Sequence, residues 1–205
     1  MDDFDYIIVG AGSSGATLAC RLAADRRIRI LLLEAGPADT SLKIRVPLGY
    51  GALFYDENFN WKYETESEPE LNGRKIYWPR GKVLGGSSAI NAMVYVRGHL
   101  NDYKQWGRVA PGWGWADVFP YFKKMETWGG PSSTIRGTSG PVNVSDMENT
   151  VHPLTQKYLE AGQELGFTHN IDYNGTEMEG VSVYQTTTFK GLRVSSATAY
   201  LSNGK

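Results

Sequence analysis

The chain has 205 residues, enough for one domain or two small ones, and 41% of them are hydrophobic, which suffices for a sizeable core. Its 21 basic and 22 acidic side chains give a net charge of −1, so there is no electrostatic case for nucleic-acid binding. The single cysteine, Cys20, excludes an internal disulfide and is typical of a reducing compartment. The N-terminal MDDFDYIIVG shows no targeting pattern, and no uncharged run is long enough to span a membrane. We therefore expect a cytoplasmic chain.

The first elements predicted along the chain form a βαβ unit. Residues 4–10, FDYIIVG, are a short apolar run suited to a buried parallel strand. Residues 13–25 are typical of a helix, in which Cys20 is expected to pack rather than to react, and residues 28–34, IRILLLE, suit a second buried strand. Strand, helix and strand in this order predict a right-handed crossover.

The turn between the first strand and the helix carries GAGSSG, which places Gly10, Gly12 and Gly15 in GxGxxG spacing. Gly10 permits a tight turn, Gly12 lets the backbone approach a pyrophosphate, and Gly15 lets the helix pack against the strand. The helix N-terminus presents free N–H groups and its positive dipole end to phosphates, and Ser13 and Ser14 offer further donors. This pattern predicts a dinucleotide site.

Glu34 ends the second predicted strand, where a carboxylate can accept both hydroxyls of an adenosine ribose. A carboxylate there also argues against a 2′-phosphate, which would favour an arginine. The alternative is a tight βα turn with Glu34 as a solvated strand end, which the surrounding strand and helix pattern disfavours. The motif by itself does not distinguish NAD from FAD.

Residues 35–80 are predicted to be irregular, with turn signals at Gly36-Pro37 and Val46-Pro47. The stretch is rich in aromatic residues, unlike a disordered linker, so we expect a lid or arm. Its residues 60–66, NWKYETE, suit a short strand. Six further elements are predicted after residue 98: helices at 102–107, 115–126, 153–165 (with Gly166 as its C-cap) and 195–201, and strands at 140–146 and 181–188.

Residues 81–98, GKVLGGSSAINAMVYVRG, form the most unusual segment of the chain. The fourteen residues from Val83 to Val96 are uncharged, yet Gly85, Gly86 and Asn91 interrupt the run, so it suits neither a membrane span nor a core strand. One alternative is a glycine-rich turn that leads to a buried helix. That alternative leaves the clustering of the glycines unexplained.

The stretch PRGKVLGGSSAINAMVYVRG resembles the first signature of the glucose–methanol–choline (GMC) flavoprotein oxidoreductases. LLEAGP after the second strand, NWKYET, WGW near Trp113 and the closing RVSSATAYL are similar to the same family, so the resemblance covers essentially the whole chain. The sequence departs from it at Lys104, where relatives often carry an acidic residue.

The resemblance implies an α/β fold with an FAD/NAD(P)-binding Rossmann-like domain over residues 1–139, including the arm at 35–80. It implies that residues 140–205 begin a substrate-binding domain with a mixed or antiparallel sheet, which is incomplete here. Bare backbone at the glycines would contact the flat flavin, Asn91 and the following amides would bond its polar edge, and residues 92–94 would cover its apolar part. For Trp61, which resembles the family's tryptophan near the adenosine, an ordinary core position is the alternative. The implied cofactor-binding residues are Gly10, Gly12, Ser13, Ser14, Gly15, Glu34, Ala35, Trp61, Val83, Gly86, Asn91, Ala92, Met93 and Val94.

Some relatives bind flavin covalently through a histidine just before the asparagine, where this chain has Ile90, so we expect non-covalent FAD. The implied reaction is hydride transfer from a small primary alcohol, choline-like compounds included, to flavin, giving an aldehyde. The implied electron acceptor is oxygen or a quinone-type compound, and peripheral membrane association of a full-length parent is compatible with the family.

The family's catalytic histidine lies in the C-terminal part of chains more than twice as long, so this chain is expected to be the N-terminal portion, with no catalytic residue of its own. We expect His99 to be structural or exposed, His152 to cap a helix and His169 to lie in a polar loop. We find no metal-ligand pattern. The alternative hypothesis is a non-catalytic FAD-binding fragment without turnover; an NAD-dependent dehydrogenase is disfavoured by residues 81–98.

Overall fold

The computed structural model describes residues 3–202. The chain forms two compact units: unit 1 comprises residues 1–93 and 189–205, and unit 2 comprises residues 94–188. Each is described by itself. This structural division differs from the expected boundary at 139/140. That boundary separates the part expected to bind the cofactor from the part expected to bind the substrate, and this functional division stays a prediction.

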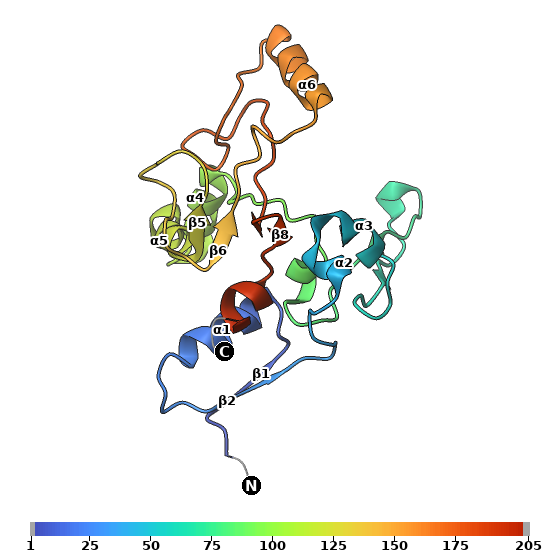
Figure 1. Cartoon of the computed structure of the whole chain (residues 1–205), viewed down its shortest axis with the longest axis vertical. Helices are drawn as coiled ribbons and strands as arrows, with labels where there is room; N and C mark the ends of the chain where they lie inside the picture. Colours follow the sequence, from blue (N-terminus) through green and yellow to red (C-terminus); the bar gives the residue numbers. More distant parts are fainter. Residues whose placement is uncertain (1–2, 203–205) are drawn as a thin grey trace. The chain divides into compact units, whose positions relative to one another are not determined.

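Unit 1 begins with the predicted βαβ unit, which is confirmed (Figure 1). Strand β1 (Tyr6–Val9) is followed by helix α1 (Ser13–Leu22) and strand β2 (Ile30–Leu33). The strands pair in parallel, in a register that matches Tyr6 with Ile30 and Val9 with Leu33. Because both strands run the same way, their carboxyl ends meet at one edge, next to the N-terminus of α1.

The prediction that these two strands are buried is wrong. The side chains of Ile7 and Val9 are 63% and 83% exposed, and that of Leu33 is 45% exposed. Among the described residues β1 and β2 form a sheet of two strands only, so β1 lacks a second neighbour. An apolar run indicates that the strand favours burial, but it does not specify which element covers it.

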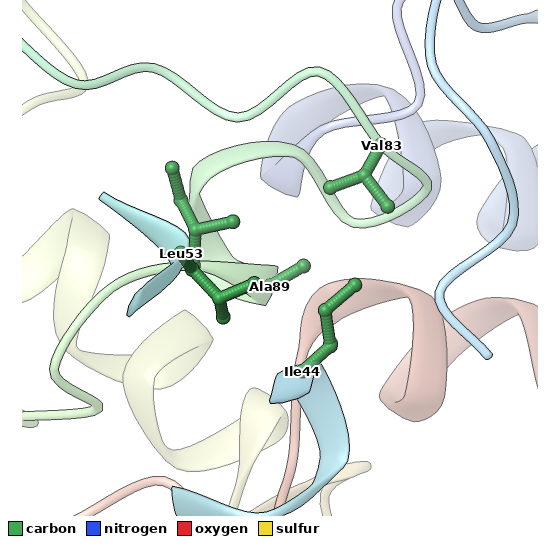
Figure 2. Close-up of a cluster of buried hydrophobic side chains, with 5 residues drawn as sticks. Ile44, Leu53, Val83 and Ala89 are labelled. Atoms are coloured by element: carbon green, nitrogen blue, oxygen red, sulfur yellow. The ribbon is translucent and has the colours of Figure 1, made fainter. Parts of the chain in front are cut away.

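The rest of unit 1 consists of short elements around a small core. Ile44, Leu53, Val83, Ala89 and Ile90 form one buried cluster (Figure 2). Ile44, Leu53 and Ala89 come from three of the short elements, α2 (Leu42–Arg45), α3 (Tyr50–Leu53) and η3 (Gly86–Ala89). The other short elements of this part are η1 (Pro47–Gly49), β3 (Tyr63–Glu64), η2 (Pro69–Leu71) and β4 (Tyr77–Trp78). The strand expected at 60–66 is thus two residues long, and β3 pairs with β4 in an antiparallel hairpin.

The chain returns to unit 1 through β7 (Thr188–Phe189) and β8 (Leu192–Arg193). The helix expected at 195–201 is present as a π-helix, η4 (Ala197–Leu201), which lies against α1 (Figure 1). The guanidinium of Arg21 lies 5.9 Å from the ring centroid of Tyr200 at this contact.

Unit 2 contains three of the predicted helices and a small parallel sheet: α4 (Leu100–Val109), α5 (Trp115–Met125), β5 (Glu126–Trp128), β6 (Val142–Val144) and α6 (Pro153–Glu164). Strand β6, expected at 140–146, pairs with β5. Gly166 follows α6 with φ +88°, as expected for a helix C-terminus. Within residues 3–202 no helix combines the length and the hydropathy needed to cross a bilayer.

The prediction of a strand at 181–188 is wrong in extent, because isolated bridges form at Val181 and Thr186 and a regular strand, β7, begins only at Thr188. Thr186 exchanges backbone hydrogen bonds with Ser145, whereas the backbone N–H of Gln185 donates to the hydroxyl of Tyr173 at 2.8 Å. The segment therefore has no single neighbouring strand along its length.

A buried ion-pair network holds unit 2 together. One oxygen of the Glu126 carboxylate accepts hydrogen bonds from Arg97 Nη2 at 2.9 Å and Arg136 Nε at 2.9 Å, and the other accepts from Arg136 Nη2 at 3.0 Å. The side chains of Glu126 and Arg136 are 0% exposed. The backbone N–H of Gly137 donates to the same carboxylate at 2.8 Å, so that the buried charge is well satisfied.

Candidate functional site

An open pocket of about 1080 Å³ lies at the carboxyl ends of β1 and β2. Ligand pockets are commonly ~300–1000 Å³, so this one is large enough for an extended ligand. In parallel sheets the crevice beyond these strand ends is the usual ligand position. The lining residues are Ile8, Val9, Gly10, Gly12, Ser13, Ser14, Gly15, Leu18, Leu33, Glu34, Ala35, Trp61, Tyr63, Arg80, Gly81, Gly86 and Ser87.

The GxGxxG turn has the geometry that its spacing predicts. Gly10 has φ +94°, and a Cβ on Gly15 would lie 1.9 Å from the carbonyl oxygen of Gly10, so the helix contacts the turn through bare backbone. A Cβ on Gly12 would meet nothing closer than 3.9 Å. Packing of the helix against the turn therefore explains why residue 15 is a glycine, whereas Gly12 leaves room on the pocket side of the turn.

The N-terminus of α1 offers hydrogen-bond donors to this pocket. Its N-cap residue Gly12 makes no side-chain cap, and there is no acidic residue in the first turn. Within residues 3–202, the backbone N–H groups of Ser13, Ser14 and Gly15 donate to no protein acceptor. Unpaired N–H groups and the positive end of the helix dipole are suited to a phosphate.

Glu34 lines the pocket and joins two of its loops. Its Oε2 accepts the backbone N–H of Ala11 at 2.8 Å, and its Oε1 accepts the N–H of Gly36 at 3.0 Å. Each carboxylate oxygen can accept a second hydrogen bond. The half-buried Glu34 is therefore fixed in place and still able to accept hydroxyl groups.

The segment 81–98 reaches the GxGxxG turn at Gly86. A Cβ on Gly86, which has φ +54°, would lie 2.7 Å from the Cα of Gly12. The adjacent backbone N–H of Gly85 donates to the carbonyl oxygen of Ala11 at 2.8 Å. The two glycine-rich segments are thus in direct main-chain contact, and Gly86 and Ser87 form part of the pocket wall.

An aromatic wall borders the pocket at the arm. The rings of Trp61 and Tyr63 are stacked, with centroids 5.9 Å apart and planes 5° apart. The Lys82 ammonium lies 4.9 Å from the Trp61 ring centroid. We predicted Trp61 but missed Tyr63 and Arg80, which also line the pocket. The alternation in NWKYETE, which places residues 61 and 63 on one face of a strand, could have identified Tyr63.

The remaining predicted cofactor residues do not line this pocket. Val83 is fully buried in the core cluster, where it supports the segment rather than contacting the pocket. Asn91 and Ala92 are exposed, Met93 is 5% exposed, and Val94, 40% exposed, forms a bridge with Thr186. Whether these five residues contact a bound ring stays a prediction.

The residues of the pocket fit a dinucleotide with a flat ring system. The N-terminus of α1 suits its phosphates, Glu34 suits ribose hydroxyls, and the bare backbone at Gly12 leaves space that a Cβ would occupy. These groups would hold the FAD that the sequence resemblance implies.

Two of the three histidines have structural roles. The Nδ1 atoms of His99 and His152 accept the N–H groups of Asn101 at 3.1 Å and Leu154 at 3.2 Å, so both cap helices. The expectation of a capping role for His152 is confirmed. His169 pairs with Glu148 across 2.9 Å. Across the described part of the chain no three His, Cys, Asp or Glu side chains converge as metal ligands.

Sequence comparison gives a match to the family described as GMC oxidoreductase over residues 4–204. The alcohol dehydrogenase [acceptor] of Pseudomonas putida is 48% identical over 200 residues, which cover 97% of this chain and 36% of that protein. The oxygen-dependent choline dehydrogenase of Photobacterium profundum is 46% identical, over 97% of this chain and 35% of that protein. The chain thus spans about a third of the length of the curated relatives it matches.

The chain is also similar to solved structures of oxidoreductases, and it again covers only part of each of those chains. Pyridoxine 4-oxidase from Mesorbium loti superposes with a TM-score of 0.92 at 36% identity, over 98% of this chain and 40% of that one. An FAD-dependent oxidoreductase from Chaetomium thermophilum superposes with a TM-score of 0.87 at 33% identity, over 97% of this chain and 36% of that one.

Proposed function

The chain belongs to the GMC oxidoreductase family, and from this membership we propose that it forms the cofactor-binding part of an FAD-dependent enzyme that oxidises a primary alcohol to an aldehyde. The observation that carries the proposal is the contact of two glycine-rich segments, at Gly12 and Gly86, on the wall of one pocket. A nucleotide site alone would require only the first segment. The second segment supplies a surface for a redox ring.

The chain's own residues bind and orient the cofactor, and bound FAD supplies the hydride acceptor. The N–H groups at the N-terminus of α1 hold the phosphates, and Glu34 accepts hydroxyls of the ribose. Ile90, 2% exposed within the core cluster, offers no nucleophile to the ring. We therefore propose that the FAD is held without a covalent bond to residue 90.

Alcohol oxidation also needs a group that takes the hydroxyl proton. Since His99 and His152 use their Nδ1 atoms as helix caps, and His169 pairs with Glu148, we assign no catalytic base within residues 3–202. A second candidate function follows from this observation: the 205-residue chain alone binds FAD without turnover.

We propose oxygen or a quinone-type compound as the electron acceptor, the cytoplasm as the location, and peripheral membrane association of the full-length parent. Reoxidation of the reduced holoenzyme by air, compared with an added quinone, distinguishes the acceptors. Co-sedimentation with lipid vesicles tests the membrane association.

The flavin spectrum of the purified chain tests the main proposal. A yellow chain that releases FAD on denaturation supports it, and a chain that fails to bind added FAD contradicts it. Anaerobic addition of a primary alcohol then tests the base: we expect no bleaching by the 205-residue chain alone. Bleaching would show that a base lies within it and would overturn the second candidate.

A further inference from the structure

The guanidinium of Arg193 is buried in unit 1 without an acidic partner. The residue is 4% exposed, and its Nη2 atom has no hydrogen-bond partner among the residues that the structure describes. Burial lowers the pKa of Arg193 to about 10, which leaves the side chain positively charged near neutral pH. A buried charge without a counterion is costly, so stability alone does not account for this residue.

Three neutral oxygen atoms accept hydrogen bonds from the other two nitrogen atoms of this guanidinium, Nε and Nη1. Nε donates to the carbonyl oxygen of Ile44 at 2.8 Å, and Nη1 donates to that of Ser88 at 3.2 Å and to Oδ1 of Asn91 at 2.8 Å. Ser88 and Asn91 belong to the segment 81–98, whose Gly86 lines the pocket. Arg193 therefore joins the RVSSATAYL stretch to the segment expected to carry the flavin.

These contacts fix the orientation of the Asn91 amide. Its Oδ1 accepts from Arg193 Nη1 and also from the backbone N–H of Met93 at 3.0 Å. Both neighbours are donors only, so the atom between them must be the oxygen. In residues 3–202 no hydrogen bond involves Asn91 Nδ2, and the residue is exposed. Arg193 thus leaves Asn91 with an amide donor that is free for a ligand.

The neighbouring serines make this arrangement rigid. The backbone N–H of Ser196 donates to Oγ of Ser88 at 2.8 Å, and Oγ of Ser196 donates to the carbonyl oxygen of Gly85 at 3.1 Å. The segment is therefore held at Gly85, Ser88 and Asn91 by a stretch about a hundred residues away in the sequence. A positive charge held in this way costs no reorganisation when negative charge develops nearby.

We propose that Arg193 is a positioning residue for the bound flavin. It orients the Asn91 amide as a donor toward the ring and places an uncompensated positive charge behind that amide. The electron-rich reduced state of the flavin is therefore favoured. This inference rests on the proposed function, in which the segment 81–98 supplies a surface for the flavin ring. A merely structural role would fix the loop and leave the redox equilibrium unchanged.

The substitution Asn91→Asp tests the amide donor and the uncompensated charge together in the FAD-loaded holoenzyme. Aspartate is nearly isosteric, keeps an acceptor for Arg193 and Met93, gives the guanidinium a counterion and removes the amide donor. We expect the melting temperature to be retained or raised. We expect the affinity of the protein for reduced flavin, relative to its affinity for oxidised flavin, to fall at least tenfold. For a two-electron couple this change lowers the midpoint potential by about 30 mV.

Asn72→Asp is the matched control, since it adds the same charge at an exposed turn of unit 1. Its flavin potential should equal that of the wild type. Arg193→Lys keeps the positive charge but loses the planar guanidinium, and its flavin potential should lie between those of the wild type and Asn91→Asp. The readout is the potential from spectroelectrochemical titration, with thermal melting in parallel.

The outcomes are distinguishable. A wild-type protein that binds no FAD overturns the proposed function and the inference with it. A wild type that binds FAD, together with an Asn91→Asp variant of unchanged potential, overturns the inference alone. If Arg193→Lys fails to fold, the comparison of Asn91→Asp with Asn72→Asp still decides the question.

Discussion

A Cβ atom on Gly86 would lie 2.7 Å from the Cα of Gly12, although 74 positions separate the two residues in the sequence. Gly86 also has φ +54°, where side chains are disfavoured. The contact closes the pocket wall between the GxGxxG turn and the segment 81–98. The position of one glycine-rich segment is therefore coupled to that of the other.

Gly86→Ala is expected to destabilise the chain by about 2 kcal/mol and to weaken FAD binding at least tenfold, because the new methyl group separates the two segments. Gly51→Ala is the matched control, since a Cβ on that helical glycine meets nothing within 4 Å. Thermal melting and titration with FAD measure both effects. Unchanged FAD affinity in Gly86→Ala would contradict the placement of the cofactor at this contact.

Glu34→Gln tests the carboxylate at the end of β2. The amide places an N–H2 group against the N–H of Ala11 or Gly36, which costs about 1–2 kcal/mol, and it accepts ribose hydroxyls less well. We expect roughly tenfold weaker FAD binding. Glu57→Gln, at an exposed position, should change neither the stability nor the FAD affinity. A variant that loses stability but keeps its FAD affinity would show that Glu34 only joins the two loops.

The βαβ unit and the nucleotide end of the site could be predicted because their signals are local. Strand, GxGxxG turn, helix and Glu34 follow one another within 34 residues, and each depends on its immediate neighbours in the chain. The wall at Tyr63 and Arg80 depends instead on how the arm folds back. No local pattern specifies that contact, although the alternation around Trp61 indicates one of its members.

Contacts between distant segments account for the other differences. The strand expected at 181–188 is broken because Gln185 and Thr186 bond to different partners, Tyr173 and Ser145. The role of Arg193 was likewise missed, because its acceptors lie about a hundred residues earlier. A single sequence predicts which residues favour burial, but long-range pairing depends on the fold.

The Glu126 carboxylate predicts an acid-dependent loss of stability in unit 2. Burial by itself would raise the pKa of Glu126, but Arg136, the N–H of Gly137 and Arg97 outweigh it, so that the pKa lies below its usual value. The stabilisation is therefore complete above the unfolded-state pKa of about 4.3, and it is lost as the pH falls through the lower folded-state value.

Glu126→Gln should cost about 3–5 kcal/mol at neutral pH, because it leaves the buried guanidinium of Arg97 without a counterion and that of Arg136 with Asp172 alone. Glu160→Gln breaks an exposed pair with Lys157 and should cost less than about 1 kcal/mol. Denaturant unfolding at several pH values provides the check. The difference between wild type and Glu126→Gln should narrow below about pH 4; a constant difference would contradict the lowered pKa.

The last prediction concerns His152, whose Nδ1 accepts the N–H of Leu154 at the start of α6. His152→Ala should cost about 1 kcal/mol through loss of this cap, and His152→Asn should restore most of it, since asparagine is a good N-cap residue. Thermal melting measures the stability, and alcohol-driven bleaching of the FAD-loaded full-length parent, in which we expect turnover, measures the chemistry. A capping residue changes the first and leaves the second intact. If His152→Ala instead abolished bleaching at an unchanged melting temperature, and asparagine failed to restore it, the histidine would act on the alcohol, and the base would have to be assigned to this chain after all.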